Sequence, residues 1–480
     1  MIMKIKQLLL IVGMAFGLLA SCSDDESFSN SSSHLLTFST DTVRLDTVFS
    51  NVPSAMRSFW VYNHSGDGVR CKSVRVENAA KSGFRVNVDG VYLGENRNYS
   101  VSDIELRDKD SIRVFVELTA PINNATDPQQ TTDNIIFTLE SGVEQRVNLN
   151  AFSWDAVAMR NVMIDRDSTI DGQGRPVIIY GGIRVDTMAT LTIAAGTTLY
   201  FHQDAGIDVY GRLLATGTAD SKVVLRGDRI DRMFDYLPYD RVPGQWQGLR
   251  FYGSSMANVL ENTDIHSTYH GIVVDSASLS QQRLTLENVT VHNCQGYGLM
   301  AIHARIGMSN TQITNTLNDC VFLAGGMAEI NNCTFAQFYP FDSNRGYAFR
   351  FTGARPLESL AVYNTLITGY ADDMLMGERQ DTTNVFNYSF ANCVIRTPKV
   401  TTADSVHFTQ VIFEDVKDTT STAEKHFMKI DTENLRYDFR LDSVSSAIDR
   451  GDASTSTKTD HDGRPRDDRP DIGAFEYIRP

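Results

Sequence analysis

An asparagine recurs at nearly regular intervals through the second half of the chain, each time directly before a short alternation of small and apolar residues. Successive copies are 26, 22, 22, 32 and 28 residues apart. A period in the low twenties with occasional insertions is typical of a solenoid, in which each repeat packs only on its neighbours. Such a period accommodates three short strands and three turns per coil. The six positions are Asn262, Asn288, Asn310, Asn332, Asn364 and Asn392.

The residues that follow each asparagine predict which side chains face the core. The next residue is Thr, Val or Cys, and the residue two further on is Ile, Val or Phe. Because alternate residues of a strand share one face, both should point inward and stack from coil to coil. We expect the asparagine amides to donate along the stack, as in cross-β ladders. A leucine-rich repeat would need leucines at fixed offsets and helical stretches, and neither is present.

This register resembles that of right-handed parallel β-helices, the scaffold of pectate lyases and of many bacterial surface proteins. We therefore expect a right-handed parallel β-helix over residues 159–400, with the C-terminal segment 401–480 as its cap. Residues 36–158 show a different pattern of short alternating segments divided by turn residues, such as Ser58–Tyr62 and Arg113–Leu118. About seven such segments predict an immunoglobulin-like β-sandwich. The predicted fold class is all-β.

Motifs along most of the chain resemble a group of Bacteroidetes β-helix lipoproteins. Leu191–Phe201 and Pro243–Gly248 resemble the first coils of these proteins, and Asp41–Gly90 resembles their front sandwich. Ser446–Asp452 and Asp471–Tyr477 resemble the closing motif of many surface-anchored β-helix proteins. The resemblance implies fold and lineage, and it implies no particular reaction.

The N-terminus predicts export and lipid anchoring. Lys4 and Lys6 precede a short apolar run that ends in small residues, which indicates a secretory signal over residues 1–21 rather than a membrane span. Cys22 at the break resembles the acylated cysteine of a bacterial lipobox. The acidic residues that follow, within a flexible tether over 22–35, resemble an export tag for the outer face of the outer membrane. The predicted partners are thus the outer membrane, through the lipid, and a glycan or host surface ligand.

The net charge and the cysteine content argue against a nucleic-acid-binding protein and against a disulfide-rich fold. The formal net charge is −15, and loss of the two signal lysines brings it to about −17. An acidic surface argues against nucleic acid as a partner, and against tight binding of polyuronates unless a local basic cleft exists. Five cysteines besides Cys22 form no CxxC pair. Because Cys333 and Cys393 occupy equivalent repeat positions, we expect buried thiols rather than a disulfide framework.

The outward side of the repeated strand carries the first candidate site. Asp264 and His266 of one coil should lie beside Thr290 and His292 of the next, with the solvated Gln312 beyond, since neighbouring coils are about 4.8 Å apart. Two histidines next to a carboxylate could act in acid–base catalysis or bind a metal. The alternative is an ordinary polar sheet face. Later coils carry apolar residues at the same outward position, which predicts that the C-terminal tail covers them.

A long insertion between coils, Asp228–Gln247, carries the second candidate site. Long loops often carry function, aromatic faces can stack on sugar rings, and arginines can hold carboxylates or hydroxyls. The alternative is a lid that plugs the solenoid or packs on the front sandwich. The predicted ligand-binding residues are Arg232, Tyr236, Tyr239, Arg241 and Trp246.

Closely spaced carboxylates near the C-terminus form a weaker candidate. Asp460 and Asp462 lie in a turn with further aspartates behind them, and carboxylates on a turn can bind Ca²⁺. The spacing does not fit an EF-hand loop, so the alternative is a solvated turn in a capping segment. No other cofactor is expected.

The sequence gives little support for catalysis. A β-helix lyase uses Lys or Arg as its base, and residues 151–400 hold only Lys222 and Lys399 as lysines. An arginine is the alternative base. Asn262–Asp264 resembles the first motif of polygalacturonases, but Glu287–Asn288 stands where a double aspartate is expected. We therefore expect binding or display at the cell surface, towards glycan. A polysaccharide lyase or glycoside hydrolase and a structural or adhesive stalk are the alternatives.

Overall fold

A computed structural model describes residues 28–234, 236–414 and 423–479. It divides into two compact units: residues up to Ile122 with Gln129–Ser153, and Asn123–Pro128 with Trp154–Pro480. The predicted signal, Cys22 and most of the tether lie outside the described residues. Within the described part of the chain, none of the helices has the length and hydropathy of a membrane span.

The first unit is a β-sandwich of two antiparallel sheets. Alternating side chains of both sheets point into one core, as in β8, where Ile112, Val114, Val116 and Leu118 are buried between more exposed neighbours. The unit also holds the short helices α2 (Ala79–Ser82) and η1 (Glu95–Arg97). One sheet has the order β1 (Leu36–Phe38), β3 (Arg57–Asn63), β8 (Ser111–Leu118), β5 (Phe84–Val88), β6 (Val91–Tyr92). The other has the order β2 (Thr42–Phe49), β10 (Glu144–Trp154), β9 (Gln129–Leu139), β4 (Val69–Val76), β7 (Ser100–Leu106).

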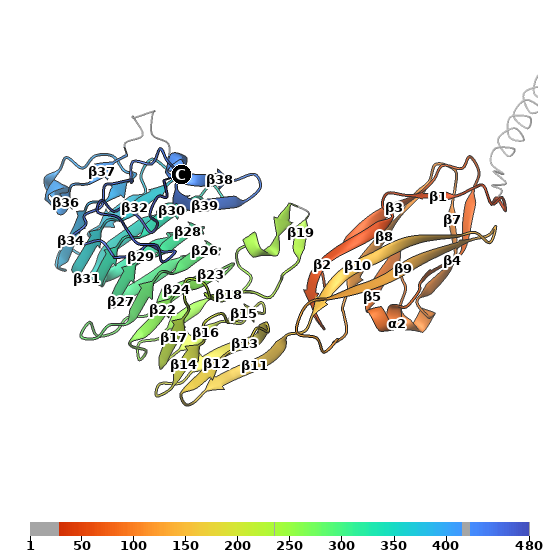
Figure 1. The fold of residues 1–480 in the computed structure, drawn as a ribbon, viewed down its shortest axis with the longest axis horizontal. Helices are drawn as coiled ribbons and strands as arrows, with labels where there is room; N and C mark the ends of the chain where they lie inside the picture. Colours follow the sequence, from red (N-terminus) through yellow and green to blue (C-terminus); the bar gives the residue numbers. More distant parts are fainter. Residues whose placement is uncertain (1–27, 235, 415–422, 480) are drawn as a thin grey trace, which may run out of the picture. The chain divides into compact units, whose positions relative to one another are not determined.

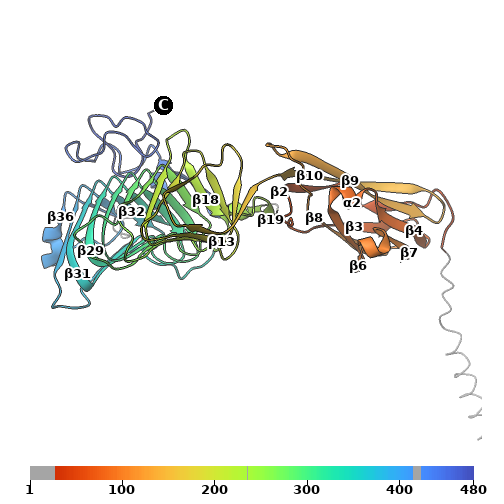
Figure 2. The same ribbon diagram turned by 90° about the horizontal axis from the view of Figure 1, so that it is seen from below.

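The second unit is a parallel β-helix, so the predicted fold class is confirmed. Its strands stack as successive coils from β11 to β37 (Figure 1 and Figure 2). The first half comprises β11 (Val157–Ile164), β12 (Ser168–Ile170), β13 (Val177–Val185), β14 (Thr190–Ile193), β15 (Thr198–Phe201), β16 (Ile207–Val209), β17 (Arg212–Thr216), β18 (Val223–Gly227), β21 (Leu249–Phe251), β22 (Asn258–Glu261), β23 (Thr263–His266) and β24 (Ile272–Val274). The second half comprises β25 (Leu284–Glu287), β26 (Thr290–Cys294), β27 (Leu299–Ser309), β28 (Gln312–Thr316), β29 (Val321–Asn331), β30 (Thr334–Gln337), β31 (Phe349–Tyr363), β32 (Leu366–Gly369), β33 (Leu375–Glu378), β34 (Phe386–Ala391), β35 (Val394–Ile395), β36 (Phe408–Thr409) and β37 (Ile412–Phe413).

One face of the coil carries the repeated strand that the asparagines mark. It runs through β15, β18, β23, β26, β28, β30, β32 and β35, and we call it the histidine face. The predicted inward residues align in register along it and have no exposed surface, which confirms the predicted direction of these side chains. That column is Leu199, Leu225, Ile265, Val291, Ile313, Phe335, Ile367 and Ile395.

The six repeated asparagines lie at one corner of the coil in a left-handed conformation, with φ between 45° and 53°. Asparagine tolerates this region better than most residues, which explains its recurrence at a tight corner. The predicted amide ladder is wrong for the later coils, because the C-terminal segment lies against this corner. Asn310 donates to the carbonyl of Thr459, and Asn364 donates to the hydroxyl of Thr455.

The C-terminal segment covers the later coils of the histidine face. It contains η3 (Ala403–His407), η4 (Ala423–His426) and a hairpin of β38 (Phe427–Asp431) and β39 (Arg436–Leu441). Phe439 and Phe475 pack in one cluster with the outward Leu366 and Val394, so the predicted cover by the tail is confirmed. Gln312 is only 8% exposed, and the expectation that it is solvated is therefore wrong.

The five described cysteines are buried free thiols, which confirms the prediction from the repeat positions for Cys333 and Cys393. Burial raises the pKa of each thiol to about 12, so they stay protonated and pack as small apolar groups.

Candidate functional site

The parallel register aligns a row of polar side chains on the outward surface of the histidine face. His266 pairs with His292 and Asp264 pairs with Thr290, so the predicted neighbourhood of the two histidines is confirmed. Arg226 of β18 lies on the preceding coil, one strand before His266. The shared position of these residues follows from strand geometry alone, because alternate positions on stacked strands lie on the same face.

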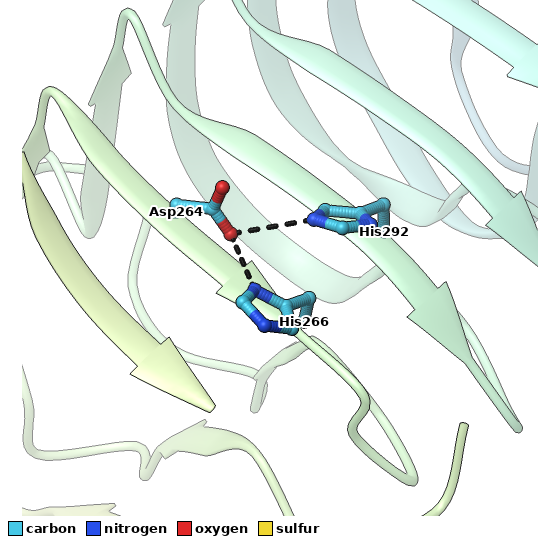
Figure 3. A group of neighbouring side chains, drawn as sticks. All are labelled: Asp264, His266 and His292. Carbon is cyan, nitrogen blue, oxygen red and sulfur yellow. Dashed lines mark hydrogen bonds and ion pairs between the residues drawn. The ribbon is translucent and has the colours of Figure 1, made fainter. Parts of the chain in front are cut away.

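Asp264 lies beside the two histidines, and the same carboxylate oxygen contacts both (Figure 3). Its Oδ1 is 2.7 Å from Nδ1 of His266 and 3.4 Å from Nε2 of His292. The two imidazole rings stack with their centres 4.8 Å apart. His266 is nearly buried, whereas about a quarter of the Asp264 and His292 side chains is exposed. The group is thus fixed on one side and open on the other.

The insertion supplies a fourth member of this group, Asp240 from η2 (Tyr239–Arg241). Nε2 of His266 donates to Asp240 over 3.1 Å, and Arg226 makes a 2.6 Å ion pair with the same carboxylate. Ser267 also donates to the carbonyl of Asp240, over 3.0 Å. Sequence reasoning missed Asp240, because nothing in the repeat pattern marks a residue that reaches the site from a loop.

These contacts fix the charge of His266. Burial opposes the charged form, but the charge of Asp264 and hydrogen bonds to Asp240 and Asp264 raise the pKa of His266 to about 9. Burial likewise opposes ionisation of Asp240, yet the His266 hydrogen bond and the Arg226 charge hold its pKa at about 2. Desolvation also opposes ionisation of Asp264, but the charges and hydrogen bonds of the two histidines hold the pKa of this carboxyl well below its usual range. At neutral pH His266 is an imidazolium between two carboxylates and is no proton acceptor.

Trp246 lies in the core of the coil and not on its surface. Its indole has no exposed area, stacks on Phe201 with ring centres 4.2 Å apart, and donates from Nε1 to the carbonyl of His266 over 2.8 Å. The predicted ligand contact through Trp246 is therefore wrong, and the indole instead packs against the first coils. This burial ties the end of the insertion to the strand that carries the site.

The other predicted residues of the insertion are partly or largely exposed. Tyr236 is 62% exposed and stacks on Phe234 beside the short pair β19 (Arg232–Phe234) and β20 (Leu237–Pro238). Tyr239 lies under the guanidinium of Arg229, and Arg241 donates to the carbonyl of Asn434 over 2.7 Å. Nothing in the structure tests a ligand-binding role of Arg232, Tyr236, Tyr239 or Arg241, which stays a prediction.

A cleft of about 460 Å³ lies between the insertion and the hairpin β38–β39. Thr290, His292, Gln312, Thr314 and Asn315 of β26 and β28 are among its lining residues. The insertion contributes Asp240 and Arg241 to the lining. The hairpin contributes Arg436, Tyr437 and Phe439 among others. A second cavity of about 310 Å³ shares Thr290, Gln312, Tyr437 and Phe439 with it, so the two adjoin.

Asn315 is the most informative residue of the cleft lining. It is 2% exposed, and among the described residues its Oδ1 has no hydrogen-bond partner. A buried polar atom of this kind costs free energy unless something bonds to it. Asn315 therefore keeps a buried acceptor without a partner at the wall of the cleft.

The turn with Asp460 and Asp462 closes the cap. Asp460 is fully buried, and its carboxylate accepts hydrogen bonds from the backbone N–H groups of Asp462, Arg464 and Glu476. Asp462 lies 3.5 Å from the guanidinium of Arg464. These contacts are those of a structural turn in the cap, and the burial of Asp460 shows that the expected solvated turn is wrong at this residue. Calcium binding by Asp460 and Asp462 stays a prediction.

No family model and no curated protein matches this chain. A PapD-like domain of human CEP192 is 10% identical over 28% of this chain and 96% of that domain, with a TM-score of 0.17. A family 123 glycoside hydrolase from Clostridium perfringens is 8% identical over 28% of this chain and 30% of that one, with a TM-score of 0.19. Dex49A from Penicillium minioluteum is 8% identical over 75% and 71%, with a TM-score of 0.16. Scores this low carry no functional argument.

Proposed function

We propose that this chain is a lipid-anchored protein of the bacterial outer surface whose β-helix binds a glycan in the cleft between the insertion and the hairpin β38–β39. The observation that carries the proposal is the cleft itself, whose lining includes Asn315 with its buried, unpartnered Oδ1. The lipid anchor rests on Cys22 and on the resemblance to Bacteroidetes β-helix lipoproteins.

The chemistry of the cleft suits sugar. Thr290, Gln312 and Asn315 provide hydroxyl and amide groups for hydrogen bonds, and Tyr437 adds an aromatic ring. Sugars present both hydroxyls and apolar faces, so a site for them combines such groups.

Arg241 and Arg436 bring two positive charges to the lining, whose carboxylate, Asp240, is already paired with Arg226 and His266. The negative net charge of the whole protein argues against an acidic sugar as ligand. The arginines of the cleft answer that argument, because the forked guanidinium group binds carboxylates.

A glycoside hydrolase is less well supported. Such an enzyme needs one carboxyl group with a raised pKa to act as general acid. Asp264 and Asp240 both have pKa values held low by His266, and Arg226 also pairs with Asp240. Neither carboxyl group holds a proton at neutral pH, so binding is the better account of this cleft.

A glycan array with the chain from residue 23 onward tests the proposal. We expect binding to a defined set of glycans, with acidic sugars prominent, and isothermal titration should locate it. Asn315→Gly should weaken binding about fivefold, since one hydrogen bond contributes about 1 kcal/mol. Glycine suits this position because Asn315 has a φ of 55°.

Asn288→Gly is the matched control, because Asn288 has a φ of 53° and does not line the cleft. Binding that Asn315→Gly and Asn288→Gly affect equally would contradict the assignment to this cleft. A folded chain that binds no glycan on the array would favour the stalk, and turnover of a bound glycan would favour the enzyme.

A further inference from the structure

Three potential metal ligands meet on two adjacent coils of the histidine face. Asp264 and His266 come from β23, and His292 comes from β26. One carboxylate oxygen and one ring nitrogen from each histidine lie within 4.8 Å of one another. The side chains reach this position because the register places His266 directly beside His292.

Two of the three separations between ligand atoms approach those of a tetrahedral site. Ligand atoms at about 2.0–2.1 Å from a zinc ion lie about 3.3 Å from each other. The distance from Asp264 Oδ1 to His292 Nε2 is 3.4 Å, which already fits. The distance from Asp264 Oδ1 to His266 Nδ1 is 2.7 Å, so this pair has to open by about 0.6 Å for that geometry.

A second carboxylate orients one of the ligands. Asp240 accepts from Nε2 of His266, and Arg226 holds Asp240 in turn. This arrangement turns Nδ1 of His266 towards Asp264. Metal-binding histidines usually donate their other ring nitrogen to a carboxylate in this way, which fixes the orientation of the ring.

We propose that Asp264, His266 and His292 bind a divalent transition-metal ion of the zinc class, through one carboxylate oxygen, Nδ1 of His266 and Nε2 of His292. The ion displaces to solvent the proton that Nδ1 of His266 carries in the metal-free chain, while Nε2 keeps its proton and its bond to Asp240. Imidazole suits zinc, cobalt and nickel better than calcium or magnesium. Three protein ligands leave one position for water or an exogenous group. His292 also lines the cleft, so the ion lies at its wall, and the metal proposal does not depend on glycan binding.

Metal titration of the full mature chain tests the site directly. The protein is treated with EDTA, freed of chelator by gel filtration and titrated with Zn²⁺ by calorimetry. A parallel Co²⁺ titration is followed by visible absorption, which reports tetrahedral coordination. We expect one ion per chain. His292→Gln and Asp264→Asn should abolish this binding, and Asp240→Asn should weaken it about 10–100-fold, as loss of an orienting partner does.

His202→Gln is the matched control. His202 pairs with the carboxylate of Asp228 over 2.6 Å elsewhere on the same β-helix and, among the described residues, belongs to no group of three potential ligands. This variant should bind Zn²⁺ as the parent does. Melting curves of every variant establish that each is folded.

Three results would overturn the proposal. The folded parent could bind neither Zn²⁺ nor Co²⁺, a folded His292→Gln variant could bind with unchanged affinity, or His202→Gln could lose binding as completely as His292→Gln. Because Gln keeps a polar side chain at a partly exposed position, we expect the His292 variant to fold. Glycan binding is measured separately on metal-free protein, so failure of one proposal does not decide the other.

Discussion

The indole of Trp246 stacks on the ring of Phe201 at an interplanar angle of 8°, with both side chains fully buried. Phe201 is the last residue of β15, and Trp246 lies near the end of the long insertion that follows β18. The stack therefore anchors the insertion in the core of the coil. Asp240 of the same insertion contacts His266.

Trp246→Ala should lower the free energy of unfolding by about 3–5 kcal/mol, as loss of a large core aromatic does. Tyr236→Ala, in the same insertion but 62% exposed, should change it by less than about 0.5 kcal/mol. Urea denaturation followed by circular dichroism measures both. Equal effects of the two substitutions would contradict the packing of Trp246.

Ile313→Asp should destabilise the β-helix by several kcal/mol, because it places an unpaired charge in the stacked inward column. Arg305→Asp, at an exposed position on β27, should stay within about 0.5 kcal/mol of the parent. Thermal melting compares them. The register would be wrong if the Arg305 variant melted as early as the Ile313 variant.

Arg466 fastens the C-terminal segment to the asparagine corner. Its guanidinium is 2% exposed, forms a 3.0 Å ion pair with Glu476 and donates to Oδ1 of Asn310 over 3.1 Å. Arg466→Met should cost about 3–5 kcal/mol, because it leaves a carboxylate without its buried partner. Arg464→Met, at a more exposed guanidinium, is the control and should cost little. Limited proteolysis should release the C-terminal segment only from the Arg466 variant.

His461 makes the contact between cap and coil sensitive to acid. Its Nδ1 donates to the carbonyl of Asn310 over 2.7 Å, so neutral Nε2 accepts from Thr290 over 3.1 Å. Burial and the Lys222 charge lower the pKa of His461 below its usual 6.5, although Asp460 and Asp462 act in the opposite direction.

The unfolded chain therefore binds a proton at His461 more readily than the folded chain. Its contribution to stability is fully present above pH 6.5 and is lost as the pH falls through the lower folded pKa. His461→Gln should melt earlier than the parent at pH 7.5 and show a weaker dependence on pH below 6.5. Melting curves across this range measure it, and an unchanged slope in the variant would assign the acid sensitivity to other groups.

Cys22→Ala should release the protein from the membrane fraction, because acylation of this thiol is the only attachment that the sequence predicts. Fractionation with labelling by a fatty-acid analogue measures it. Continued membrane association with normal labelling would exclude lipidation at Cys22. Ser21→Ala, at the neighbouring position, is a control that should stay anchored and labelled.

The repeat made much of the β-helix predictable. Alternation after each asparagine assigned Ile313 to the core, and the spacing placed His266 beside His292, because stacked parallel strands repeat the same geometry in every coil. The cover over Leu366 was also predictable, since an apolar residue on an outward face needs a partner. These inferences require only local periodicity.

Contacts outside the repeat were decided by the tertiary structure alone. Asp240 joins His266 across the insertion, Trp246 turns into the core, and the hairpin β38–β39 forms one side of the cleft over Gln312. Loop and tail residues have no fixed register, so their side chains settle where burial and hydrogen bonding are most favourable. Periodicity sets which way a strand residue points, whereas the path of a non-repetitive segment depends on the completed surface against which it packs.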